Sequence, residues 1–248
     1  MKKRVLGCAL VLLATAAQAQ SSSKDFSAWQ GIMFTPVGAF PGIEPSLGGR
    51  TDDSKQLALR GSTWKFASDD DRQNSVGVSY FAPPSSAIRY GATMGWTEPS
   101  GGNGVFLIGL ETAGDFLKAS SMSGTGSAFT IDWKLSAGLG HFSGSVGGTV
   151  WSFVAQAPIL WQYRMVSKSE LSLHLTPGFG LGGTTDSGGL EAETGTRPMI
   201  GLGGAFTSAR GIGLHLGAHL VPIDLGPTAD SAPWVMGAAL SFPIGGKK

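Results

Sequence analysis

The sequence predicts an all-β fold, a single antiparallel transmembrane β-barrel of about ten strands, with eight and twelve strands left open. The first observation is residues 127–137, where apolar and polar side chains alternate without interruption, as in a strand with one oily and one wet face. The same two-residue period returns in several later segments, and the last of these ends the chain. The third observation is an amino-terminal export signal.

Residues 1–19 are predicted to be a cleaved signal peptide. Basic residues precede an apolar run over residues 5–14, and Ala17 and Ala19 provide the small side chains that signal peptidase recognises. The apolar run is too short for a membrane-spanning helix, which needs about 20 residues. Cys8, the single cysteine of the chain, lies in this segment. The mature chain is therefore expected to have no disulfide, thiolate metal site or thiol nucleophile.

The charge balance excludes one class of partner. Without the three basic residues of the signal, 15 Lys and Arg remain against 17 Asp and Glu, a net charge of −2. We therefore expect no nucleic-acid partner. After the signal, no apolar stretch reaches the roughly 18 residues of a membrane helix, whereas a barrel hides its hydrophobicity in alternation. The 39 glycines suit the turns and crowded wall positions of a barrel.

Two regions follow the signal. Residues 20–56 have apolar residues interrupted by Pro36, Pro41 and Pro45, so this region is predicted to be a periplasmic arm or a first strand, and a plug inside the barrel is a further alternative. Residues 57–248 are predicted to form the barrel. Its first strands are expected at residues 57–66, 75–81, 87–97 and 104–111, separated by turn-forming residues such as those at 69–74.

Residues 149–165 are predicted to be one long strand with a local bend, because their alternation keeps one phase across Pro158. Beyond them the connections differ in length. Residues 167–169 and 208–210 are short, whereas residues 184–196 and 222–233 are long. Short periplasmic turns and longer outer loops are typical of outer-membrane barrels, and counting back from a periplasmic carboxyl terminus favours ten strands.

Residues 237–242, Gly-Ala-Ala-Leu-Ser-Phe, resemble the carboxy-terminal insertion signal of outer-membrane barrels, in which a glycine precedes two spaced apolar or aromatic residues. The chain departs from that pattern by continuing for six residues after Phe242. At the level of class, it resembles small Gram-negative outer-membrane β-barrel proteins. The resemblance implies a place in the cell outer membrane, with membrane lipids, lipopolysaccharide and other envelope proteins as partners. A soluble secreted β-sandwich is the alternative.

Three histidines fall on faces assigned to the lumen: His174, His215 and His219. On one strand, the spacing of His215 and His219 separates them by about 13 Å, too far to share a metal ion. We interpret all three as hydrogen-bonded lumen residues, and we expect neither a metal nor a cofactor. The lipid A deacylases of the outer membrane carry a His-x-Ser pair that His174 and Thr176 resemble, with threonine in place of serine.

Charged and polar residues are predicted to point into the lumen: Arg89, Asp132, Lys134, Gln162, Arg164 and Glu170. In a barrel of about ten strands they would pair as a polar core or leave a narrow pore. For the deacylase resemblance, the glutamates on offer, Glu191 and Glu193, lie in a loop. Residues 69–71, three aspartates, are interpreted as solvated turn charge, and glycine-rich residues 201–204 as strand rather than a phosphate-binding loop.

No motif outweighs a structural explanation, so we expect no enzyme and no catalytic residue. The expected function is that of a structural or interaction component of the envelope, such as a subunit of a trans-envelope machine for export, adhesion or surface motility. Its partners would contact residues 184–196, residues 222–233 and the region 20–50. A narrow channel for small solutes is the first alternative, and a lipid A-modifying enzyme is the second.

Overall fold

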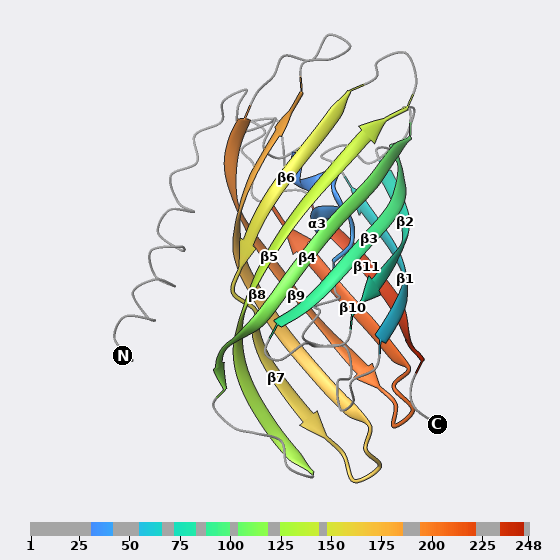
Figure 1. Ribbon diagram of the computed structural model, residues 1–248, viewed down its shortest axis with the longest axis vertical. Helices are drawn as coiled ribbons and strands as arrows, with labels where there is room; N and C mark the ends of the chain where they lie inside the picture. The colour runs from blue at the N-terminus through green and yellow to red at the C-terminus, as the bar shows by residue number, and fades with distance from the viewer. Residues whose placement is uncertain are drawn as a thin grey trace, which may run out of the picture.

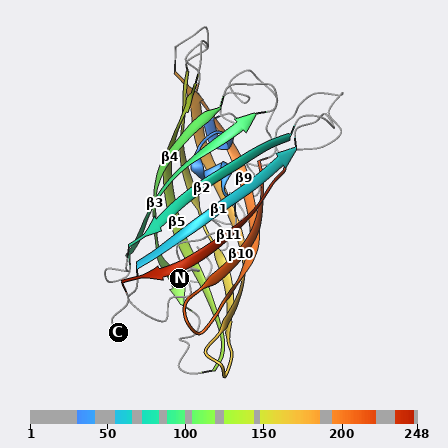
Figure 2. The same ribbon diagram turned by 90° about the vertical axis from the view of Figure 1, so that its right-hand side faces the viewer.

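A computed structural model of the chain contains a single closed β-barrel around the short helix α3 (Figures 1 and 2). It describes residues 31–41, 55–65, 72–82, 88–99, 104–118, 125–143, 148–185, 194–221 and 234–245. The elements are α3 (Pro36–Ala39), β1 (Lys55–Lys65), β2 (Arg72–Phe81), β3 (Ile88–Pro99), β4 (Val105–Lys118), β5 (Gly126–Phe142), β6 (Thr149–Gln156), β7 (Ile159–Arg164), β8 (Glu170–Thr184), β9 (Thr194–Thr207), β10 (Gly213–Leu220) and β11 (Trp234–Ile244).

Neighbouring strands pair antiparallel in sequence order, and the pairing of β1 with β11 closes the barrel. Closure matters because a membrane offers no hydrogen bonds to an open sheet edge. β6 and β7 both pair with β5 on one side and β8 on the other, so the eleven segments form ten strands. The predicted all-β class and the strand count of ten are confirmed.

The bend between β6 and β7 occurs at Ala157 and Pro158, as predicted for one long strand. The register on both sides is unbroken: Gln156 lies opposite Gly178 of β8, and Ile159 lies opposite Leu175. Although Pro158 cannot donate, its carbonyl oxygen accepts a hydrogen bond from the Asp132 amide at 2.8 Å. The proline therefore removes one ladder bond without ending the strand.

The two faces of the wall have opposite chemistry. In β5 the inward Asp132, Lys134 and Ser136 are buried, whereas the outward Leu135 and Leu139 are exposed. The same alternation runs through the other strands. On the outer surface, for example, the Leu110 side chain of β4 is 66% exposed. A wall that is apolar outside and polar inside reverses the arrangement of a soluble protein and fits a barrel surrounded by lipid.

The two ends of the barrel are distinguished by their connections. β8 to β9 and β10 to β11 are joined at one end by residues 185–193 and 221–233, while residues 165–169 and 208–212 make short turns at the other. The end with the longer connections is the outer end, and the other is the periplasmic end. Predicted boundaries shift slightly: β2 begins at Arg72, inside the predicted turn 69–74, and β8 and β9 extend into residues 184–196.

The region predicted as an arm or first strand is different where the structure describes it. Residues 31–41, which include α3, lie inside the barrel, and β1 begins at Lys55, so the expectation of a periplasmic arm or strand does not hold for them (Figure 1). They correspond to the plug alternative. The predicted signal peptide lies outside the described residues. Within those residues, no helix has the length and apolar character needed to cross a membrane.

Candidate functional site: a plugged lumen

The plug, residues 31–41, is a compact turn of chain in the outer half of the lumen. Pro36 begins α3, where its fixed φ suits the first helical position and its missing N–H costs nothing. The amides of Ala39 and Phe40 donate to the carbonyls of Thr35 and Pro36 at 3.0 and 3.1 Å. Four residues cannot form a stable helix alone, so the wall must hold this one.

Side chains of two strands, β1 and β6, bind the plug. Thr35 Oγ1 donates to the Ile32 carbonyl at 2.9 Å and shares a 2.7 Å hydrogen bond with Ser152 Oγ of β6. From β1, Arg60 Nη2 donates to the Phe40 carbonyl at 2.6 Å, and its guanidinium lies 5.5 Å from the centre of the Phe40 ring. Ser62 Oγ donates to the Ala39 carbonyl. These bonds satisfy plug carbonyls that the short helix leaves unpaired.

Apolar packing seals the space around the plug. Phe34 packs edge-on against Trp64 of β1, with ring centroids 5.7 Å apart, and against Phe142 at 5.2 Å. Plug residues and inward wall residues form one buried cluster: Ile32, Met33, Phe34, Ala39, Phe40, Trp64, Val105, Leu107, Val150, Val154, Met199, Val221 and Val235. The wall members lie toward the outer ends of their strands. The outer half of the lumen therefore resembles the core of a soluble protein.

Glycines of the wall let the plug approach the sheet closely. A Cβ added to Gly138 of β5 would lie 2.8 Å from Thr35 Cβ and 3.1 Å from Pro36 Cδ. A Cβ on Gly77 or Gly95 would lie 2.6 Å from Cζ of Phe40. Such distances are too short for carbon atoms, so the plug occupies space that only glycine leaves open.

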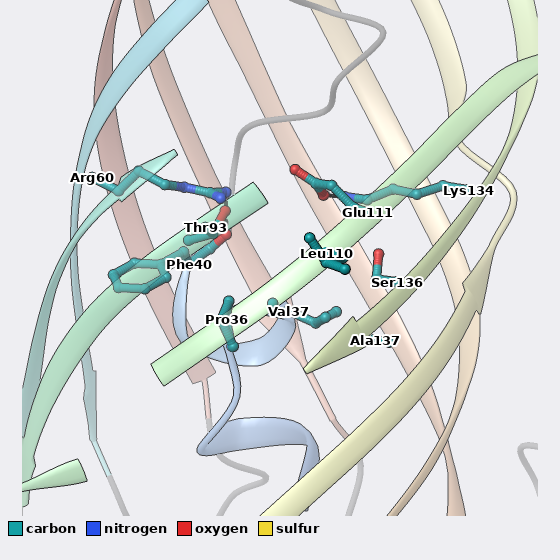
Figure 3. A pocket seen from close by; sticks show the side chains of 11 residues that line it. Pro36, Val37, Phe40, Arg60, Thr93, Leu110, Glu111, Lys134, Ser136 and Ala137 are labelled. Carbon is teal, nitrogen blue, oxygen red and sulfur yellow. Dashed lines mark hydrogen bonds and ion pairs between the residues drawn. The ribbon is translucent and has the colours of Figure 1, made fainter. Parts of the chain in front are cut away.

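A small cavity of about 20 Å³ lies beside α3 (Figure 3), enough for a water molecule. Pro36, Val37 and Phe40 line it from the plug. From the wall, the Arg60 guanidinium and the Glu111 carboxylate point toward each other across it (Figure 3). Lys134 Nζ of β5 forms an ion pair with Glu111 Oε2 of β4 at 3.1 Å. The cavity marks the change from apolar packing to charged wall.

The periplasmic half of the lumen is held by ion pairs. Arg89 Nη2 of β3 contacts Asp115 Oδ1 at 2.7 Å and Asp132 Oδ2 at 2.9 Å, which joins three neighbouring strands. Arg164 and Gln162 of β7 both bind Glu170 of β8, at 3.4 and 3.2 Å. All six residues predicted to point inward thus take part in polar contacts of the lumen. They pair mainly along the wall rather than across it, because neighbouring strands are closer than opposite ones.

The three histidines also face the lumen, as predicted. His174 Nδ1 lies 3.0 Å from Thr176 Oγ1, and His215 Nε2 lies 2.9 Å from Ser241 Oγ. The His219 ring lies over Gly201 of β9, where an added Cβ would be 2.8 Å from its Cδ2. Within the described ranges, no three His, Cys, Asp or Glu side chains form a group that could hold a metal ion.

Some predicted features lie where they were expected, and others lie outside the described residues. Residues 201–204 lie within β9, as expected for strand. Residues 69–71, Glu191, Glu193 and residues 222–233 lie outside the described residues, as do most of the residues of 184–196.

Sequence reasoning left the plug as one of three alternatives, and it missed the partners Arg60, Glu111 and Asp115. A usable signal was present, since the outer ends of β4 and β6 are apolar on both faces, at Val105, Leu107, Val150 and Val154. Side chains that face an aqueous lumen are expected to be polar. Inward apolar residues therefore indicate that an apolar segment of the chain fills the barrel at this height.

A shallow apolar groove of about 660 Å³ runs over the outer surface of β2 to β6. Its hollows lie at Ala92 and Ala137, between larger neighbours such as Tyr80, Leu110 and Phe153. These side chains face away from the lumen, so the groove belongs to the lipid-facing surface.

No protein-family model and no curated protein sequence matches the chain. Among solved structures, the chain is similar to the outer membrane enzyme PagL, with a TM-score of 0.37, 12% identity, and coverage of 76% of this chain and 99% of that one. For the β domain of the Bordetella autotransporter BrkA, the TM-score is 0.41 and the identity 11%, and the match covers 78% of this chain and 100% of that one. For Ail of Yersinia pestis, the TM-score is 0.25 and the identity 13%, and the match covers 76% of this chain and 97% of that one.

The barrel's own surfaces assign it to the outer membrane. Its closed hydrogen-bonding leaves no sheet edge, its outer face is apolar, and its inward side chains are polar or packed against a plug. Closed β-barrels with these faces span outer membranes. The protein is an outer-membrane β-barrel.

Proposed function

We propose that this protein is a closed, non-catalytic barrel that serves as a structural or interaction component of the cell envelope, such as a subunit of a trans-envelope machine for export, adhesion or surface motility. The observation that carries the proposal is the plug. Ile32 and Met33 are fully buried and Phe40 is 3% exposed, so solutes meet a packed core in the outer half of the lumen. What the barrel offers to other molecules is then its ends and its outer surface.

Conductance in planar bilayers tests the proposal, with a locked plug as the matched control. Thr35 Oγ1 and Ser152 Oγ are 2.7 Å apart, so the double substitution Thr35→Cys and Ser152→Cys is expected to form a disulfide between plug and wall. Both the native and the oxidised double variant should be silent. Conductance of the native barrel and of the reduced double variant, lost when the double variant is oxidised and restored when it is reduced, would instead establish the narrow channel.

Partner capture tests the interaction role itself. The native protein is extracted in mild detergent, and a gel that compares heated with unheated samples verifies that the barrel is folded. Folded barrel should co-purify with defined envelope proteins, and the same proteins should be lost from the membrane complex when this chain is deleted. The proposal would be contradicted if the barrel showed no conductance, co-purified with no envelope protein, and could be deleted without loss of any envelope complex.

The position of His174 and Thr176 supports a role without catalysis. His174 is 6% exposed and Thr176 is fully buried, and both face the lumen, whereas lipid A reaches a barrel from its outer surface. We expect the same lipid A acylation pattern by mass spectrometry in cells that lack the protein, that overproduce it, or that carry His174→Ala. A pattern that changes on overproduction and reverts with His174→Ala would establish the lipid-modifying alternative.

A further inference from the structure

The apolar groove on the lipid-facing surface is built from two adjacent rows of outward side chains that cross β2 to β6. The row nearer the outer end consists of Val78, Met94, Ile108, Leu139 and Trp151. The deeper row consists of Tyr80, Ala92, Leu110, Ala137 and Phe153. Large and small side chains alternate in the deeper row. Ala92 and Ala137 therefore leave two hollows beside a continuous apolar row.

The groove runs obliquely through one half of the membrane. It crosses four strand spacings of about 4.8 Å, so it is about 19 Å long. With strands tilted by about 40°, each strand crossed changes the height by about 3 Å, or about 12 Å in all. This is half of an apolar band about 25 Å tall. The length and slope are those of a chain that spans one leaflet.

The higher end of the groove is at β6. The outer ends of β5 and β6 extend further than that of β2 (Figure 1). Trp151, which lines the groove at this end, is only two residues from Thr149, the outer end of β6. The groove therefore descends from the outer surface of the membrane at β6 toward its middle at β2.

A polar pair lies above the higher end of the groove. His141 of β5 and Thr149 of β6 are paired across the two strands, two residues further out than the groove. His141 is exposed, and its Nδ1 lies 3.2 Å from Thr149 Oγ1. Trp96 and Phe106 continue the same row on β3 and β4, as expected for the aromatic girdle at the level of the lipid headgroups. A molecule in the groove would meet apolar side chains along its length and hydrogen-bonding groups at its outer end.

We infer that this groove binds one acyl chain of lipid A, with a headgroup phosphate at His141 and Thr149. Lipid A is the lipid of the outer leaflet, where the groove begins, and its phosphates accept hydrogen bonds from imidazole N–H and hydroxyl groups. A flexible alkyl chain can follow an oblique hollow, whereas the convex wall of a second barrel would rest on its rims. This inference goes beyond the proposed function and does not depend on whether the barrel has protein partners.

Titration of the purified, folded barrel with lipid A tests the inference, with native mass spectrometry counting the bound lipids at a fixed detergent concentration. Ala92→Leu combined with Ala137→Leu fills both hollows and keeps the surface apolar. Ala218→Leu combined with Ala238→Leu is the matched control, because these are small outward residues of β10 and β11, outside the groove. A gel that compares heated with unheated samples verifies that each variant is folded.

The native barrel should saturate with one lipid A. The filled variant should bind it about tenfold more weakly, the effect of losing contact with about two methylene groups, while the control binds as the native barrel does. His141→Ala should weaken the binding of lipid A several-fold and leave the binding of dephosphorylated lipid A unchanged.

Three results would overturn the inference. The first is equal affinity of the native and filled barrels for lipid A. The second is equal affinity of the native barrel for lipid A and for phosphatidylglycerol, which would mean that the site does not select the lipid of the outer leaflet. The third is a dimer of the native barrel that the filled variant does not form, which would make the groove an interface between two copies.

Discussion

The outer and periplasmic halves of the lumen are enclosed by the same ten strands, but different interactions fill them. In the outer half, the plug packs against inward valines and against glycines such as Gly138, and neutral hydrogen bonds such as Thr35 to Ser152 join it to the wall. In the periplasmic half, charged inward residues form ion pairs such as Arg89 with Asp115 and Asp132. A barrel of ten strands can thus be filled by an apolar insert or by its own charges.

This difference predicts how much stability each half loses when one of its residues is replaced. An apolar core loses stability in proportion to the contact that is disturbed, and it tolerates a lost hydrogen bond. Removing one partner of a buried ion pair, by contrast, strongly destabilises the fold, because the remaining charge is left without compensation. Substitutions in the periplasmic half should therefore have the larger effects.

Arg89→Met should have the largest effect. It leaves Asp115 and Asp132, both within 2.9 Å of the lost guanidinium, without their shared cation. We expect the free energy of unfolding to fall by about 3–5 kcal/mol, measured by urea unfolding of the folded barrel in lipid vesicles. Arg210→Met, in the exposed turn between β9 and β10, is the matched control and should change stability by less than about 0.5 kcal/mol. Equal effects of the two substitutions would contradict the ionic description of this half.

A rescue separates charge from packing at the same site. Adding Asp115→Asn and Asp132→Asn to Arg89→Met removes the uncompensated charges while keeping the side-chain sizes similar. Most of the lost stability should return, since replacing all members of an ion cluster costs less than removing one. No recovery would indicate that the Arg89 side chain acts mainly by filling space.

The sequence predicted the periplasmic half better than the outer half. Alternation placed Arg89, Asp132 and Lys134 in the lumen, because a period of two fixes the face of every residue once one is known. It could not predict the partners of Arg89, since pairing depends on the stagger between strands. The plug was only one of three alternatives, because α3 has four residues and its stability comes from wall contacts that no local pattern encodes.

Gly138→Ala tests the close approach in the outer half. The three nearest atoms to the new methyl group all belong to Thr35 and Pro36, so the strain falls on the plug and not on the wall. We expect a loss of about 1–3 kcal/mol, measured by the same urea unfolding. Gly61→Ala is the matched control, because the nearest atom to its Cβ is 3.9 Å away. If both alanines were equally tolerated, the plug would not be seated on the glycines of β5.

Thr35→Val should have the smallest effect and the most specific one. Valine keeps the shape of threonine but leaves Ser152 Oγ without the 2.7 Å hydrogen bond, at a cost of about 1 kcal/mol. The Ile32 carbonyl also loses its bond from Thr35 Oγ1 but keeps the one from the Thr35 amide, and this loss cancels in the comparison because it occurs with and without Ser152→Ala. Combining it with Ser152→Ala removes both polar groups, so the double variant should be more stable than the sum of the single losses predicts. The coupling is measured by unfolding all four proteins of the cycle. Strict additivity would mean that plug and wall are not coupled through this hydrogen bond.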